Sequence, residues 1–186
     1  MPVLPFEINV CGIVELDGFH DRRVSHVLSI LDPDHPVPDA CGRWGEHARL
    51  ELRFHDIVDE HPGMIPPTPA DVARILDFGS TLGDVAHLLV HCHAGVSRST
   101  AALTLLLAQA RAEPEAALDE VVRIRPQAWP NLRMLEHGDA QLGLRGRLLD
   151  AVRTHYRRVA ARNPDFVRAM AHAGRAREVP ENFPLW

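Results

Sequence analysis

The sequence contains no lysine, and all 20 of its basic residues are arginine. This looks like a bias of composition, and no mechanism follows from it. Cysteine is also scarce: Cys11, Cys41 and Cys92 form an odd set without the spacing of a disulfide framework. We therefore expect a reducing compartment, the cytoplasm, and not a disulfide-stapled secreted fold.

Long apolar runs are missing too. No stretch is long enough to cross a bilayer, and the chain does not open with a charged and then apolar leader. We therefore predict neither a membrane span, a membrane partner nor a signal peptide. The composition, 46% hydrophobic and 24% charged over 186 residues, is that of a globular protein large enough to bury a core. It predicts a single domain over 1–186, with a core at about 8–162 and an extension at 163–186.

The net charge of −5 is unevenly distributed. Residues 145–186 hold nine arginines and four acidic residues, a net charge of +5, so the rest of the chain carries −10. A solvated helix face explains the basic section more simply than an anionic partner does. We expect no nucleic-acid partner.

Short apolar segments alternate with helical patterns along the chain. We predict strands at 8–16, 24–31, 49–54 and 86–91. We predict helices at 69–80, from Ser99 onward, and at 114–124, 131–142 and 145–162. Thr68, followed by Pro69 and Asp71, predicts the cap of the first helix. This order predicts an α/β fold with a central, mostly parallel sheet of four to five strands and helices on both faces.

The segment HCHAGVSRST at 91–100 lies between a predicted strand and a predicted helix. Backbone N–H groups there could cradle a phosphate at the positive end of the helix dipole. Gly95 would allow the tight turn, and Arg98 would bind two phosphoryl oxygens. The same electrostatic field favours the thiolate of Cys92. Two other interpretations are weaker. One is a buried structural cysteine. The other is a metal site, which is disfavoured because the side chains of His91, Cys92 and His93 alternate in direction along the strand and cannot converge on one ion.

HCHAGVSRST resembles the signature loop of the cysteine-dependent protein tyrosine phosphatase superfamily, His-Cys-x5-Arg-Ser/Thr. Its AGxSRS form is most similar to the dual-specificity branch, bacterial types included, and WPNLRMLEHGDAQL resembles a helix start late in that domain. The resemblance implies that Cys92 is the nucleophile, Arg98 the phosphate clamp and Ser99 a donor to the thiolate. It implies that His91 orients the loop and helps to favour the thiolate. The phosphate-binding loop would comprise His93, Ala94, Gly95, Val96, Ser97 and Arg98, with neither metal nor cofactor.

The reaction also needs a general acid to protonate the leaving oxygen. In the family this is an aspartate some thirty residues before the cysteine, and the candidates here are Asp56, Asp59 and Glu60. We favour Asp56, which ends a predicted strand 36 residues before Cys92, over Asp59.

The resemblance implies hydrolysis of phosphorylated proteins at tyrosine, and at serine or threonine as well. The lysines that phosphoinositide-specific members carry beside the cysteine are absent, with His93 and Val96 in their places, so a lipid phosphate is disfavoured. A phosphorylated metabolite or a nucleotide stays open, as does a pseudophosphatase that binds phosphate without turnover. A protective disulfide between Cys92 and Cys11 or Cys41 also stays open.

Overall fold

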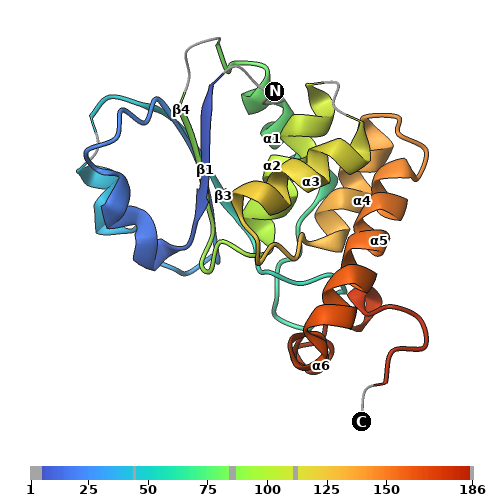
Figure 1. Cartoon of the computed structure of the whole chain (residues 1–186). Coiled ribbons are helices and arrows are strands. Elements are labelled where there is room, and N and C mark those ends of the chain that lie inside the picture. The colour runs from blue at the N-terminus through green and yellow to red at the C-terminus, as the bar shows by residue number, and fades with distance from the viewer. Residues whose placement is uncertain (1–5, 44, 84–86, 111–112, 185–186) are drawn as a thin grey trace.

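The computed structural model describes residues 6–43, 45–83, 87–110 and 113–184, which form a four-stranded sheet packed against α-helices (Figure 1). The strands are β1 (Glu7–Cys11), β2 (His26–Leu31), β3 (Ala48–Arg53) and β4 (His87–His91). Every pairing in the order β1-β4-β2-β3 is parallel. The predicted fold class is therefore confirmed.

The helices agree closely with the predicted ones. They are α1 (Pro69–Gly79), α2 (Arg98–Gln109), α3 (Pro114–Ile124), α4 (Leu132–Gln141), α5 (Arg147–Arg162) and α6 (Pro164–His172). Short 3-10 helices span Ile13–Phe19 (η1), Asp39–Gly42 (η2) and Ala176–Glu178 (η3). The predicted cap of α1 is present, because Thr68 Oγ1 accepts a hydrogen bond from the backbone N–H of Asp71 at 3.2 Å. No helix in the described ranges is long and apolar enough to cross a membrane.

The two faces of the sheet are covered differently. Alternate residues of β2 point to opposite sides: Leu28 and Ile30 join the main core beneath the α-helices, whereas Val27 joins a smaller cluster with Leu16 of η1 and Cys41 of η2. Figure 1 shows η1 and η2 on the side of the sheet opposite α1–α5. The helices on the second face are therefore 3-10 helices, which is a refinement of the predicted arrangement.

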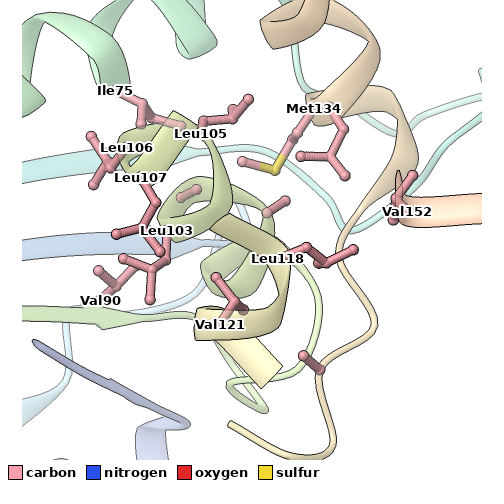
Figure 2. Close-up of a cluster of buried hydrophobic side chains, with 14 of the residues drawn as sticks. Ile75, Val90, Leu103, Leu105, Leu106, Leu107, Leu118, Val121, Met134 and Val152 are labelled. Carbon is pink, nitrogen blue, oxygen red and sulfur yellow. The ribbon is translucent and has the colours of Figure 1, made fainter. Parts of the chain in front are cut away.

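Helix α2 is the centre of the main core. Its residues from Arg98 to Ala108 are all buried, which leaves no solvent-facing stripe along that length. Figure 2 shows its leucines among apolar side chains of the surrounding elements, including Ile75, Val90, Leu118, Val121, Met134 and Val152. Each fully buried leucine contributes roughly 2 kcal/mol through removal from water. This packing fixes the N-terminus of α2, and with it the loop that precedes it.

The first strand is shorter than predicted. β1 ends at Cys11, and residues 13–16, expected to continue it, lie in η1. A Cβ at Gly12 would lie 2.8 Å from the carbonyl oxygen of His93, and the backbone N–H of Ile13 donates to that oxygen at 2.9 Å. The chain leaves the sheet here because it packs against a distant loop, a contact that local sequence patterns do not reveal. Residue 86, expected in β4, and residues 111–112, expected in α2, lie outside the described residues.

Candidate active site

The loop between β4 and α2, residues 92–98, is called the phosphate loop below. It begins at Cys92 directly after β4 and ends at Arg98, the first residue of α2. Because β4 lies between β1 and β2 in a parallel sheet, the loop lies at the carboxyl edge of an interior strand. This is where open α/β sheets bind ligands.

The carbonyl oxygens of the phosphate loop are bound from outside it. Five consecutive residues, 93–97, accept hydrogen bonds in this way, from Ile13 N, Arg125 Nη2, Arg125 Nε, Trp129 N and Asn131 N in that order, at 2.8 to 3.3 Å. Within the described part of the chain, none of the backbone N–H groups of 93–97 donates a hydrogen bond. Consecutive free N–H groups in a tight turn form a concave site for an anion.

Gly95 is required for this loop to fit against β1. Its φ is +69°, a conformation that other residues adopt at a cost, and a Cβ there would lie 2.5 Å from the carbonyl carbon of Cys11. Backbone atoms cannot give way as the end of a side chain can. The predicted role of Gly95 therefore has both a conformational and a steric basis.

Cys92 is 2% exposed, and its Sγ lies 3.2 Å from Oγ of Ser99, which is fully buried. The predicted pairing of thiol and hydroxyl is thus present. All three cysteines are buried free thiols, and burial is the main reason why the pKa of Cys11 is raised to about 12. The thiolate of Cys11 is accordingly scarce at neutral pH.

His91 lies behind the loop, fully buried on β4. Burial and, after it, the positive charge of Arg49 lower its pKa to about 4 against the opposing effect of the Cys92 backbone, so the imidazole is neutral at pH 7. Neither ring nitrogen has a well-formed hydrogen bond to another described residue. A neutral ring fills space behind the loop but supplies no positive charge to the Cys92 thiolate. The predicted effect of His91 on the Cys92 thiolate stays a prediction.

The Arg98 guanidinium has one nitrogen that binds two oxygens and a buried nitrogen without a partner. Its Nη1 donates at 2.6 Å both to Oδ1 of Asp32 and to the carbonyl oxygen of Phe54. Its Nε is buried and has no partner in the described part of the chain. A buried N–H beside a cradle of backbone N–H groups is suited to a phosphoryl oxygen.

Asp32 and His93 form one rim of the site. The backbone N–H of Asp32 donates to Nε2 of His93 at 3.2 Å, and the His93 side chain is 31% exposed. Burial and the positive charge of Arg98 lower the pKa of His93, which favours the neutral ring that this hydrogen bond needs. His91 and His93 therefore occupy different environments, one in the core and one at the rim.

Asp56 contacts the phosphate loop directly. Its Oδ1 accepts hydrogen bonds from Ser97 Oγ at 2.7 Å and from Asn131 Nδ2 at 2.9 Å. The same oxygen lies 3.1 Å from Nη1 of Arg175. Asp59 instead faces Arg177, with Oδ1 3.3 Å from Nη1. Glu60 lies further along the same loop, 3.5 Å from Arg133. Of the three predicted candidates, the structure places Asp56 at the loop.

The Asp56 carboxyl group is held in its ionised form. Partial burial opposes ionisation, but the charges of Arg175 and Arg98 and the hydrogen bonds from Ser97 and Asn131 outweigh it, so the pKa of Asp56 is lowered. The side chain is still 31% exposed, which leaves access to the site for a ligand.

Several residues of this site were not assigned a role from sequence. Asn131 caps α4 by accepting from the Met134 N–H at 3.1 Å while its amide donates to Asp56. Arg125, bound to two loop carbonyls, also pairs with Glu15 at 2.7 Å. The Pro-Asn pair before α4 was a detectable signal for Asn131. Arg125 and Arg175 had none, because they are two arginines among 20 and act over long sequence distances.

Comparison with known proteins gives one sequence relative and several similar folds. Over 137 residues the chain is 30% identical to the human protein phosphatase Slingshot homolog 3, a match that covers 70% of this chain and 18% of that protein. The chain thus corresponds to less than a fifth of that relative's length. No family model matches the sequence.

The fold comparisons cover more of each partner. Human DUSP28 superposes with a TM-score of 0.55 at 19% identity, over 76% of this chain and 97% of that chain. A mouse putative dual specificity phosphatase, solved as a complex with zinc tungstate, gives 0.57 at 19% identity, over 78% and 87%. The chain therefore has the fold of these dual-specificity phosphatase structures.

Proposed function

We propose that the protein is a phosphomonoester hydrolase that works through a cysteinyl-phosphate intermediate. The Cys92 thiolate attacks phosphorus, so that an S–P bond forms as the P–O bond to the leaving group breaks. A water molecule then attacks the same phosphorus, its O–P bond replaces the S–P bond, and phosphate leaves. One observation carries this proposal. The carbonyl oxygens of 93–97 are hydrogen-bonded to residues outside the phosphate loop, which leaves the backbone N–H groups of 93–97 free between Cys92 and the unpartnered Nε of Arg98.

Asp56 is the general acid and then the general base in this mechanism. It gives a proton to the leaving oxygen in the first step and recovers one from water in the second. Because its pKa is lowered, the protonated form needed for the first step increases as the pH falls below 7. A bound phosphate dianion beside Arg98 acts in the opposite direction, since a neighbouring negative charge raises the pKa of a carboxyl group.

The proposed substrates are proteins phosphorylated on tyrosine, and on serine or threonine as well, in the cytoplasm. The odd set of three cysteines, without the spacing of a disulfide framework, supports the compartment. The lack of lysine in the phosphate loop supports a protein over a lipid phosphate. Small phosphorylated metabolites and nucleotides fit the same loop chemistry. Trapping ligands from lysate on the Cys92→Ser protein would separate proteins from metabolites.

One observation favours a second function, phosphate binding without turnover. Arg175, Ser97 and Asn131 all bind the same carboxylate oxygen of Asp56 and stabilise its ionised form, which cannot donate a proton. A pseudophosphatase would show the affinity without the chemistry.

Hydrolysis of p-nitrophenyl phosphate between about pH 5 and 7 separates the two functions. We expect wild-type activity that rises toward acid pH and a Cys92→Ser protein at the background rate. Equal rates for the two proteins, with phosphate still bound, would establish the binding function. Asp56→Asn and Asp59→Asn should then be compared on an aryl phosphate with a poorer leaving group, where full activity of Asp56→Asn would contradict its role as the acid.

A further inference from the structure

The C-terminal segment, residues 163–184, lies outside the sequence resemblance but contacts the candidate active site. Val167 of α6 is fully buried in the main core, and the ring of Phe166 lies 5.4 Å from that of Trp129. Trp129 in turn donates its backbone N–H to the phosphate loop at Val96. The segment therefore packs on the structure that supports the loop.

Arg175, which follows α6, is 4% exposed and has two bound edges. On one edge, Nε and Nη2 donate to the two carboxylate oxygens of Glu178 at 2.7 and 2.6 Å. On the other edge, Nη1 donates to Ser97 Oγ at 2.8 Å and lies 3.1 Å from Oδ1 of Asp56. One guanidinium thus joins the phosphate loop to the candidate acid.

Glu178 fixes this guanidinium from behind. It is fully buried, and its carboxylate also accepts hydrogen bonds from Trp129 Nε1 at 2.5 Å and from the Leu132 N–H at 2.9 Å. The planar pairing of guanidinium and carboxylate holds Arg175 in one orientation. Its Nη1 can therefore point only toward Ser97 and Asp56.

We propose that Arg175 is a positioning residue that holds Asp56 against the phosphate loop, so that the C-terminal segment completes the active site. This inference rests on the proposed function, because it assumes that Asp56 transfers the proton. It assigns to the extension a role in catalysis through Asp56, in addition to its packing on the core.

The charges around Asp56 determine how this role can be measured. Arg98 of α2 and Arg175 of the C-terminal segment are the positive groups facing it, with His93 of the phosphate loop, Tyr156 of α5 and Glu178 of η3 as the other titratable neighbours. Removing Arg175 leaves one guanidinium instead of two and removes an attractive contact. The pKa of Asp56 should therefore rise, and the carboxyl should be less firmly placed.

The test compares the variants Arg175→Met/Glu178→Gln and Arg177→Met with wild type. The double change removes both buried charges. Trp129 Nε1 and Leu132 N donate to different oxygens of Glu178, so the single glutamine oxygen can accept from only one of them, and urea unfolding is used to check that the fold is retained. Arg177→Met is the matched control, because Arg177 lies two residues after Arg175, in the 3-10 helix that contains Glu178, but pairs with Asp59 and Glu136. The readouts are the pH profile of kcat on an aryl phosphate with a poor leaving group, and the titration of the Asp56 carboxyl carbon by NMR, assigned with Asp56→Asn.

We expect the double variant to lose about tenfold or more of its maximal kcat, within the range of a general acid's contribution. We also expect the basic limb of its kcat pH profile and the NMR titration of Asp56 to move to higher pH. Both should be unchanged in Arg177→Met. If Arg175 only packed against the core, the double variant would lose kcat without a shift of the basic limb of its pH profile, and that result would overturn the inference. A shift of that limb in Arg177→Met but not in the double variant would overturn it too. If wild type hydrolyses no aryl phosphate while the titration still moves, the proposed function fails and the electrostatic contact stands.

Discussion

The phosphate loop and the C-terminal segment each place a buried arginine near Asp56, and they differ in how that arginine is satisfied. Arg98 keeps a buried Nε without a partner in the described structure, whereas Nε and Nη2 of Arg175 are both bound to Glu178 and its Nη1 to Ser97. A guanidinium with a free donor is suited to a ligand, and one with its edges bound is suited to hold other residues in place. The arginine suited to bind a ligand thus lies in a local motif, and the arginine suited to hold Asp56 in place lies in a distant segment of the chain.

The largest expected effect separates the chemistry of the loop from its framework. Cys92→Ser should reduce aryl phosphate hydrolysis to the background rate, because a hydroxyl at this position is a far weaker nucleophile than a thiolate. Serine is close in size to cysteine, so the urea midpoint should stay near that of wild type. Steady-state kinetics and urea unfolding check both statements, and residual turnover well above background would exclude Cys92 as the nucleophile.

Breaking the buried pair in the C-terminal segment should cost mainly stability. Arg175→Met alone leaves Glu178 buried without its counter-charge, and such a loss costs about 3–5 kcal/mol. Adding Glu178→Gln should recover part of that loss, because it removes the unpaired buried charge, and Asp56, the other partner of Arg175, is partly exposed and can be solvated. Urea unfolding of the single and double variants at pH 7 gives the comparison. Equal destabilisation of the two would show that the Glu178 charge is not the cause.

A change at Gly95 disturbs the loop without touching the C-terminal segment. Gly95→Ala should destabilise the protein by roughly 2–4 kcal/mol, from the left-handed conformation and from overpacking against Cys11. Gly63 is a matched control, since its φ is +75° with nothing within 4 Å of an added Cβ. Gly63→Ala should cost only the conformational part, roughly 1–2 kcal/mol. Similar thermal unfolding of the two variants would refute the steric argument.

The smallest effect concerns His91, behind the loop. Because its pKa falls to about 4 on folding, the unfolded chain takes up the proton at higher pH than the folded protein does. Neutral His91 therefore stabilises the folded protein fully only above the unfolded pKa of about 6.5. As the pH falls from there toward 4, the free energy of unfolding decreases, by roughly 2 kcal/mol between pH 7 and 5. His91→Leu should therefore lose less stability than wild type over that interval. Parallel losses in urea unfolding at the two pH values would exclude this role.

Much of the fold, including the position of the phosphate loop, could be predicted from sequence because the signals are local. The capping pattern at Thr68 defines the start of α1, and the spacing of Cys92 and Arg98 between a strand and a helix defines the phosphate loop. The end of β1 at Cys11 could not be predicted, because the cause is the close contact of Gly12 with His93, 81 residues away in the chain.

The support of the site is the part that sequence could not provide. Arg175 and Asp56 are separated by 119 positions, and a single arginine in an arginine-rich section has no pattern that marks it. The charge excess of that section favoured a solvated face, whereas Arg175 within it is buried. Such a pairing depends on how α6 packs against Trp129, which only the tertiary structure shows.

The most direct test of the account is detection of the covalent intermediate. Wild type and Asp56→Asn should be mixed with p-nitrophenyl phosphate, whose good leaving group needs little protonation, then quenched in acid within the first turnovers and digested for mass spectrometry. We expect one added phosphoryl group on the peptide that contains Cys92, at higher occupancy in Asp56→Asn because activation of water is slowed there. Turnover with no phosphoryl group on that peptide, or with the group on another residue, would contradict it.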